Sequence, residues 1–136
     1  MAQIKDIVID CEHPASLARF WASVLDGYHV APYGEAELAR LRALGIDDVE
    51  DDPSVLVEAP GVLPRCFFQR VEELKSVKNR LHLDVVAEDP GLELARLIEL
   101  GAIVIADRRS PGHLVTLADP EGNEFCLLWR SRLVER

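Results

Sequence analysis

The feature that most limits how this chain can fold is an internal repeat. Residues 6–14, DIVIDCEHP, and residues 82–90, HLDVVAEDP, are matching segments that begin 76 positions apart. In each segment apolar and polar residues alternate, as in a strand with one buried face. Each ends on a proline, which a helix tolerates in its first turn because the missing N–H has no partner there. The repeat predicts two strand-to-helix units, although two such segments can also arise by chance in an α+β domain.

An amphipathic helix is expected after each proline. After Pro14 the apolar residues that recur at helical spacing are Leu17, Phe20, Trp21, Val24 and Leu25, and Gly27 follows them. After Pro90 the corresponding residues are Leu94, Leu97 and Ile98, with Asp89 as a candidate N-cap and Gly101 as a candidate C-terminal glycine. Such spacing and end signals are typical of surface helices that pack one face on a sheet.

Three β-rich runs follow each predicted helix. They are YHVAPY, SVLVEA and PRCFFQRV in the first half, and AIVIAD, HLVTLAD and EFCLLW in the second. The sequence therefore predicts an α+β fold of two βαβββ modules, at residues 1–71 and 80–136, joined by a polar linker at 72–79. The first module also carries an inserted helix at 35–44. A ferredoxin-like βαββαβ sandwich is the competing prediction, which the surplus of strands disfavours.

Composition narrows the classes of partner. A chain of 136 residues that is 49% hydrophobic can form one domain with a real core. Its formal net charge of −9 disfavours nucleic acid as a partner. Neither a signal peptide nor an apolar run long enough for a membrane helix is visible, and three unpaired cysteines suit a reducing compartment, so we expect a cytoplasmic protein. The acidic run at 47–53, DDVEDDP, is interpreted as a solvated loop.

The strand around His82 has two different faces. Because side chains alternate along a strand, His82 and Asp84 point to one side, and Leu83 and Val85 to the other. In the first module Asp6 and Asp10 repeat the polar side, and Ile7 and Ile9 the apolar side. One side of each strand is therefore apolar, and the other carries polar residues.

Three stretches resemble the vicinal oxygen chelate superfamily, which comprises glyoxalase and bleomycin-resistance-like proteins, and within it the glyoxalase-like subgroup. They are DIVIDCEHPASLARFWASVLDG, NRLHLDVVAEDPGLELARLIELGA and LADPEGNEFCLLW. The resemblance implies one curved eight-stranded mixed sheet, with the helices on its convex face and a ligand cavity on its concave face. The superfamily includes isomerases, lyases, dioxygenases and proteins that only bind ligands, so a shared fold does not fix an activity.

The resemblance also implies where ligands would be bound. The residues expected in the cavity are Asp6, Asp10, Gln69, His82, Asp84, Glu124 and Cys126. Family members that bind metal use the start of each module's first strand and a position on each module's last strand, which here gives Asp6, Gln69, His82 and Cys126. This mixture of hard and soft donors suits Mg²⁺, Mn²⁺ or Fe²⁺ poorly. Zn²⁺ is left as an alternative, but zinc sites normally place at least three strong His, Cys or carboxylate ligands together, and the spacing of these four residues does not show that they converge. We therefore expect no cofactor or metal, with these four residues as the ligands if a divalent metal is bound.

Several candidate residues have a structural alternative. His82 could be a core histidine that donates to Asp84 or to a carbonyl, and Cys126 could be a small buried apolar residue. Glu124 either lines the cavity or lies at the solvent-exposed end of its strand.

Two functions follow from these residues. One is an enzyme of the lyase, isomerase or dioxygenase type that uses His82 or Asp84 as acid or base. The other is a non-catalytic protein that sequesters a small organic ligand without metal, as in the bleomycin-resistance branch.

A homodimer is the expected assembly. Exposed sheet edges are commonly covered by association, and twofold dimers are the commonest soluble oligomers. The resemblance points the same way, because family members often dimerise. Phe20 and Trp21 add a reason of their own, because adjacent residues of a helix lie about 100° apart around its axis, which could leave one of them at the margin of the buried stripe.

Overall fold

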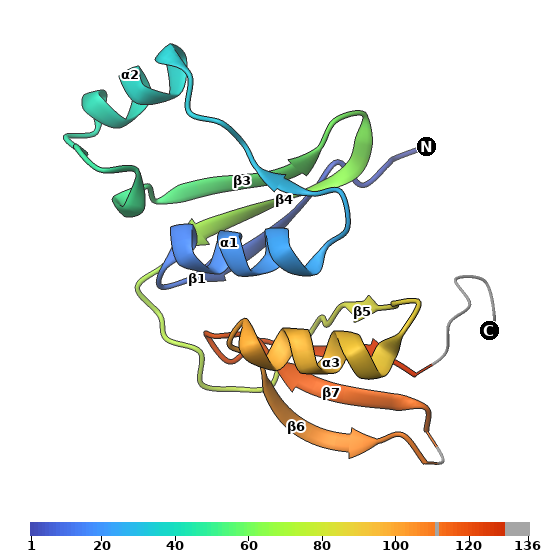
Figure 1. Ribbon diagram of the computed structural model, residues 1–136. Helices are drawn as coiled ribbons and strands as arrows, with labels where there is room; N and C mark the ends of the chain where they lie inside the picture. Colours follow the sequence, from blue (N-terminus) through green and yellow to red (C-terminus); the bar gives the residue numbers. More distant parts are fainter. Residues whose placement is uncertain (111, 130–136) are drawn as a thin grey trace. The chain divides into compact units, whose positions relative to one another are not determined.

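The computed structural model describes residues 1–110 and 112–129, and the predicted end of the second module, residues 130–136, lies outside this part. The chain forms two compact units, Met1–Leu74 and Lys75–Arg136. Each unit contains a four-stranded mixed sheet, and each follows the order βαβββ (Figure 1). The α+β class and the two modules are thus confirmed. The strands form two separately hydrogen-bonded sheets, instead of the single eight-stranded sheet that the sequence predicted.

The sheet of the first unit has the strand order β1-β4-β3-β2. Its strands are β1 (Asp6–Cys11), β2 (His29–Val30), β3 (Ser54–Ala59) and β4 (Val62–Arg70). β1 pairs in parallel with β4, and the other pairs are antiparallel. The residues buried on one face of this sheet are Val55, Val57, Cys66 and Phe68.

Helix α1 (Pro14–Val24) packs on β3 and β4. Pro14 begins the helix, as predicted. Phe20 and Trp21 are both buried, and their rings meet edge to face with centroids 5.6 Å apart. Neither ring lies at an exposed margin, so this reason for expecting a dimer does not hold.

The insertion of the first unit contains α2 (Glu35–Ala43) and a short 3-10 helix, η1 (Val49–Asp51). Asp52 follows η1, and its side chain is 1% exposed. Its carboxylate accepts hydrogen bonds from the Tyr33 hydroxyl at 2.7 Å, from the Arg40 guanidinium at 3.0 Å and from the Ser54 backbone N–H at 2.9 Å. The acidic run is therefore not wholly a solvated loop, because one of its carboxylates attaches α2 to the sheet.

The sheet of the second unit has the strand order β5-β8-β7-β6. Its strands are β5 (Asp84–Val85), β6 (Ile103–Arg108), β7 (Leu114–Ala118) and β8 (Glu124–Leu128). The residues fully buried on one face are Val115, Leu117, Phe125 and Leu127. β5 is shorter than the sequence predicted, because only Asp84 and Val85 pair with β8.

Helix α3 (Pro90–Glu99) contacts β8. Its start is set by Asp89, whose side chain accepts a hydrogen bond from the Leu92 backbone N–H at 3.0 Å, as predicted for an N-cap. Leu97 is its buried residue. Gly101 follows the helix with φ +114°, a conformation that residues with a side chain rarely adopt.

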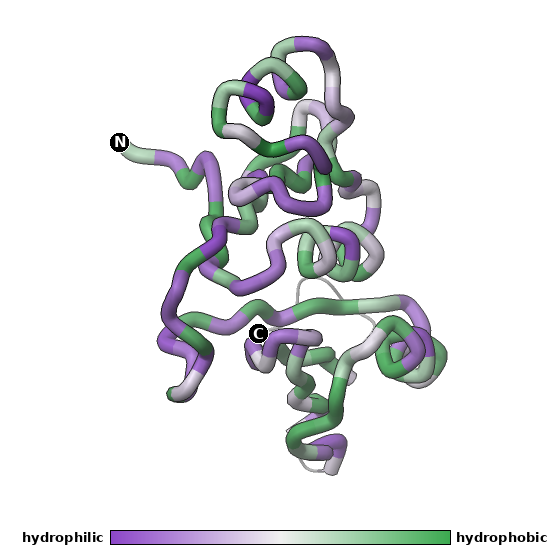
Figure 2. The backbone as a smooth tube through the Cα atoms, turned by 90° about the vertical axis from the view of Figure 1, so that its left-hand side faces the viewer, coloured by the Kyte–Doolittle hydropathy of each residue, from purple (hydrophilic) through white to green (hydrophobic). Residues whose placement is uncertain are grey.

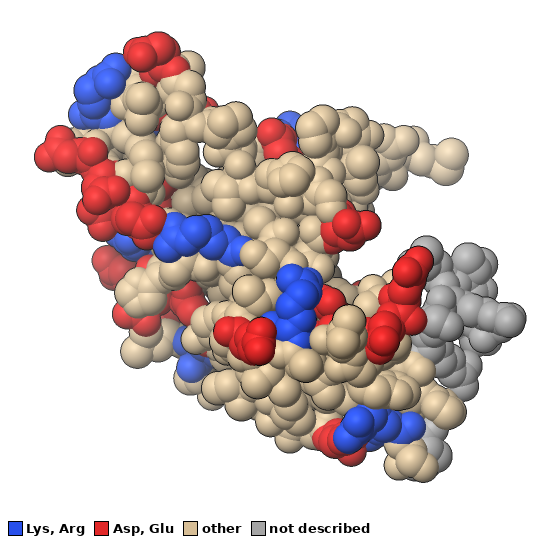
Figure 3. Space-filling view, in the orientation of Figure 1, with Lys and Arg blue, Asp and Glu red and all other residues tan. Residues whose placement is uncertain are grey.

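Apolar and polar residues alternate along much of the backbone in both units (Figure 2). On the face shown in Figure 3, acidic side chains gather around α2 and η1, with basic side chains beside them. Among the described residues no helix is long and apolar enough to span a membrane.

Candidate functional site

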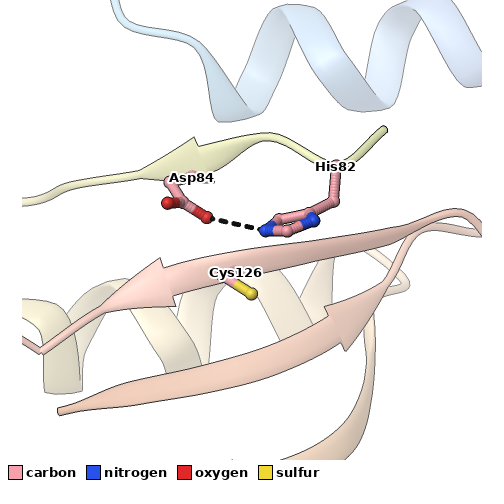
Figure 4. A group of neighbouring side chains, drawn as sticks. All are labelled: His82, Asp84 and Cys126. Carbon is pink, nitrogen blue, oxygen red and sulfur yellow. Dashed lines mark ion pairs between the residues drawn. The ribbon is translucent and has the colours of Figure 1, made fainter. Parts of the chain in front are cut away.

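The strongest candidate site lies on the second sheet, on the face opposite α3. Asp84 in β5 is the parallel partner of Cys126 in β8, and Cys126 is in turn the antiparallel partner of Thr116 in β7. Residues paired in this way point to the same side of a sheet. His82 comes two residues before Asp84, and Figure 4 shows its ring beside the Asp84 carboxylate, with Cys126 on the neighbouring strand β8.

Three metal-binding or proton-transferring side chains meet at this point. His82 Nε2 is 3.3 Å from Asp84 Oδ1. One donor atom from each of His82, Asp84 and Cys126 lies within 4.8 Å of the other two. The His82 and Asp84 side chains are 51% and 53% exposed, whereas Cys126 is 9% exposed. The cluster is therefore open to solvent on the imidazole and carboxylate side and closed on the thiol side.

Thr116 is a neighbour of this cluster that the sequence analysis missed. Its hydroxyl oxygen lies 3.7 Å from the Cys126 sulfur, close enough for a weak hydrogen bond. The sequence contains a pattern that could have identified Thr116. It is the polar residue between Val115 and Leu117, which are both buried, so its side chain points to the opposite face of the sheet.

Glu124 lies on the same strand as Cys126, but its carboxylate already contacts the segment that precedes β5. Its carboxylate accepts a hydrogen bond from the Asn79 backbone N–H at 3.3 Å and lies 3.6 Å from the Lys75 ammonium. Burial raises the pKa of Glu124, but hydrogen bonds from backbone N–H groups and the nearby lysines outweigh this effect, so the pKa lies below its ordinary value. Glu124 therefore fastens the segment before β5 to β8.

The corresponding polar face of the first sheet is organised differently. Arg65 donates two hydrogen bonds to the Asp6 carboxylate, at 2.7 and 3.1 Å, and its guanidinium lies 5.3 Å from the centroid of the Phe67 ring. The hydrogen bond from Arg65 lowers the pKa of Asp6. A lowered pKa in the folded chain means that this ion pair stabilises the fold above the unfolded-state pKa, and that this stabilisation is lost as pH falls through the folded-state pKa.

The structure does not bring Asp6 and Gln69 together. Asp6 pairs with Arg65 in the register of β1 and β4, whereas Gln69 pairs with exposed Asp10, four residues further along. At about 3.3 Å per residue this separates the two positions by roughly 13 Å, too far for both side chains to bind one ion. The first-module pair expected from the resemblance is therefore not assembled, although Asp6, Asp10 and Gln69 do share one face, as predicted.

The internal repeat identifies the first-unit counterparts of the cluster. The positions 76 residues before His82 and Asp84 are Asp6 and Val8. Val8 pairs with Phe67, just as Asp84 pairs with Cys126. The first unit thus has a valine and a phenylalanine where the second has a carboxylate and a thiol.

The fit of a metal can be judged from these donors. In the second unit an imidazole, a carboxylate and a thiol converge, and these are the three ligand types that Zn²⁺ accepts. In the first unit the Asp6 carboxylate is already held by Arg65. The donor set that suits a metal is therefore His82, Asp84 and Cys126, and not the set of four expected from the sequence.

Comparison with solved structures shows which folds are similar. The fosfomycin resistance protein FosX from Mesorhizobium loti is 12% identical, with 96% of this chain and 93% of that chain covered and a TM-score of 0.65. FosX from Listeria monocytogenes, solved with Mn(II) and 1S,2S-dihydroxypropylphosphonic acid, is 11% identical, with 96% and 94% covered and a TM-score of 0.67.

The trypanothione-dependent glyoxalase I of Leishmania major is also similar. It is 15% identical, with 94% of this chain and 86% of that chain covered and a TM-score of 0.60. At these identities the likeness shows a common fold, and the fold alone does not establish an activity. No curated protein matches the sequence.

Family membership follows from the sequence match together with this fold. The glyoxalase-like domain family matches residues 6–128, from the first residue of β1 to the last residue of β8. The match therefore includes both βαβββ units and every residue of the cluster. The chain belongs to the glyoxalase-like domain family, within the vicinal oxygen chelate superfamily.

Proposed function

We propose that this protein is an enzyme that binds a small organic molecule at the open face of the second sheet, where His82 and Asp84 act as an acid-base pair. The observation that carries this proposal is the 3.3 Å contact between His82 Nε2 and Asp84 Oδ1, with both side chains about half exposed. An imidazole held by a carboxylate is well suited to proton transfer, because the carboxylate fixes the orientation of the ring.

The chemistry supported by this pair is proton transfer to or from a bound substrate, as lyases and isomerases require. An oxygenase-type reaction would in addition need a redox-active group. The three similar structures reported above are two fosfomycin resistance proteins and a glyoxalase, and one of them was solved with a small organic molecule bound, so a protein of this fold can hold such a ligand. The proposal for this chain rests on its own residues.

Replacing His82 by alanine is the first test of the site. We expect the dissociation constant of a fragment found by screening a small-molecule library to rise at least about tenfold, because one charge-assisted hydrogen bond is lost. The free energy of unfolding should change by less than about 1 kcal/mol, because the side chain is half exposed. Calorimetric titration and urea unfolding measure the two quantities.

The matched control is His13→Ala. His13 is the N-cap residue of α1 in the first unit, and its side chain is 65% exposed. Fragment binding should be unchanged in this variant. Unfolding of the His82→Ala variant would instead identify His82 as a structural histidine. Equal fragment binding by the two variants would show that the binding site does not lie on the second sheet.

A non-catalytic ligand-binding protein is the second candidate. It is favoured by one observation, namely that the Asp6 carboxylate is held by Arg65 and is separated from Gln69 along the sheet. Ligand binding that depends on His82, with no chemical change in any bound compound, would support this alternative. Gln69→Ala tests whether the first unit also contributes to binding.

A homodimer remains a prediction. Its remaining structural support is β6, an edge strand of the second sheet on which Ile103, Val104 and Ile105 are all exposed. Exposed apolar edge strands are commonly covered by association.

A further inference from the structure

We propose that the Cys126 thiol is the nucleophile of the site and adds to the β-carbon of an α,β-unsaturated carbonyl compound, while His82 takes the thiol proton. The inference rests on the proposed function for the role of the His82–Asp84 pair, and it names the class of small organic molecule on which the pair acts. Proton transfer stays with His82 and Asp84, and Cys126 forms the covalent bond.

The Cys126 sulfur lies where a thiol can use this pair. It is within 4.8 Å of a ring nitrogen of His82 and of a carboxylate oxygen of Asp84. Proton transfer from sulfur to nitrogen needs a separation of roughly 3.5 Å or less, so the sulfur or the ring moves by about 1 Å, which a side-chain rotation supplies. Contacts between a nucleophile and its base are often this loose before a substrate binds.

Three strands hold the thiol in place. Cys126 in β8 pairs with Asp84 in β5 and with Thr116 in β7. Its backbone N–H donates to the Leu83 carbonyl at 2.9 Å, which joins β8 to the segment that carries His82. The Thr116 hydroxyl oxygen lies 3.7 Å from the sulfur. The nucleophile is thus carried by a paired strand, which positions a side chain more precisely than a loop does.

Access to the sulfur is narrow. The His82 and Asp84 side chains are 51% and 53% exposed, whereas Cys126 is 9% exposed. A reacting carbon therefore approaches over the imidazole and the carboxylate, which keeps it within reach of the proton-transferring groups. A flat, trigonal carbon presents its face to the sulfur with little bulk, so the narrow access favours it over a tetrahedral carbon.

The chemistry of a thiol narrows the electrophile further. Sulfur is soft and polarizable, and so prefers the β-carbon of an α,β-unsaturated carbonyl to the harder carbonyl carbon. As the S–C bond forms, the π bond between the α- and β-carbons breaks, its electron pair moves toward the carbonyl oxygen, and the thiol proton passes to His82. Transfer of that proton to the α-carbon completes the adduct. The step needs no oxidant, reductant or second substrate.

Reversal of the addition gives the site a catalytic cycle. Before the α-carbon is protonated, the bond between the α- and β-carbons is single and can rotate. Breaking the S–C bond then returns the electron pair to the double bond and the proton to the sulfur. A cis alkene of this class is thereby converted into the more stable trans alkene.

The other two cysteines are less suited to react. Cys66 is 4% exposed on the helix-packed face of the first sheet, and burial, with a smaller effect of Asp6, raises the pKa of its thiol. Cys11 is 5% exposed, and its thiol donates to the Gln69 backbone carbonyl at 3.7 Å. We therefore expect Cys126 to react first.

Alkylation by N-ethylmaleimide tests the nucleophile. This compound belongs to the proposed class, and its ring prevents rotation, so the adduct accumulates. The full-length protein, treated with a chelator so that no metal ion competes for the thiol, should be alkylated first at Cys126, as peptide mass mapping after a brief reaction detects. In His82→Ala the rate at Cys126 should fall at least about tenfold, although loss of the ring opens access to the sulfur. This variant is expected to stay folded, because His82 is half exposed.

Cys66→Ser is the matched control, and its rate of alkylation at Cys126 should equal that of the wild type. Equal or faster alkylation of Cys126 in His82→Ala would identify a merely accessible thiol and overturn the proposal. First alkylation at Cys11 or Cys66 would also overturn it.

Conversion of dimethyl maleate into dimethyl fumarate, followed by proton NMR, tests the catalytic cycle. The wild-type protein should catalyse it, Cys126→Ser should not, and Cys66→Ser should match the wild type. No conversion by the wild type, or equal conversion by Cys126→Ser, would contradict the cycle. Fragment binding that depends on His82, without any reaction at Cys126, would overturn the nucleophile and leave the proposed function intact. Alkylation that depends on His82, without binding of any fragment, would show the reverse.

Discussion

Replacing Phe125 by alanine is expected to lower the free energy of unfolding by about 3–5 kcal/mol, the range for truncating a buried aromatic residue. Phe125 is 0% exposed and lies in β8, next to Cys126 but on the opposite face, among Val115, Leu117 and Leu127. The variant leaves a cavity where the apolar face of the sheet packs. Urea unfolding followed by tryptophan fluorescence and circular dichroism measures the change.

Asp84→Ala is the control for Phe125→Ala. Asp84 lies on the other face of the same sheet, and its side chain is 53% exposed. We expect a change of less than about 0.5 kcal/mol. Comparable losses in the two variants would contradict the assignment of one face to packing and the other to ligand binding.

Replacing Asp52 by alanine is expected to reduce stability by about 2–4 kcal/mol. The change leaves the Tyr33 hydroxyl and the Ser54 N–H, both partly buried, without their acceptor, and an unsatisfied group costs about 1–3 kcal/mol when it is fully buried. Arg40 loses one of its two carboxylate partners but keeps Glu37, and its side chain is 36% exposed, so water replaces part of the interaction. The expected loss is therefore below that of a fully buried ion pair.

Glu50→Ala provides the comparison within the same acidic run. Glu50 pairs with Arg19, and both side chains are 54% exposed, so its loss should cost less than about 1 kcal/mol. Asp52→Asn should be milder than Asp52→Ala, because its one amide oxygen can still accept from Tyr33 or from Ser54, which donate to different carboxylate oxygens of Asp52. Equal stability of the Asp52→Ala and Glu50→Ala variants would contradict the anchoring role of Asp52.

Burial and the Asp52 carboxylate raise the pKa of Tyr33, so its hydroxyl remains a donor throughout the ordinary pH range. This network was not predictable from the sequence. Tyr33, Arg40 and Asp52 come from separate parts of the insertion, and nothing in the local pattern of DDVEDDP distinguishes the one buried carboxylate from its exposed neighbours.

The modules were predictable because their signals are local. Alternation along residues 6–11, the prolines at the helix starts and the Asp89 N-cap each act within a few residues. The shared face of His82 and Asp84 follows from the same period of two, and the structure places Cys126 on that face.

The pairing partner of Gln69 could not be predicted from the sequence, because it depends on how two distant strands align. Which residue of β4 lies beside Asp6 is set by the parallel register between β1 and β4, and an intervening helix and an insertion separate these strands. The register places Arg65 there, and this arginine holds the Asp6 carboxylate. A change of two or four residues in this register cannot be predicted from the local apolar-polar pattern, because residues 65, 67 and 69 all point to the same face.

The central claim is that the open face of the second sheet, around His82 and Cys126, is the functional site. Amide chemical-shift mapping of the wild-type protein with a small-molecule fragment library tests it most directly. We predict that the largest shifts fall on His82, Asp84, Thr116 and Cys126. Shifts centred on Asp6, Val8 and Phe67 of the first sheet, with none on those four residues, would contradict the claim.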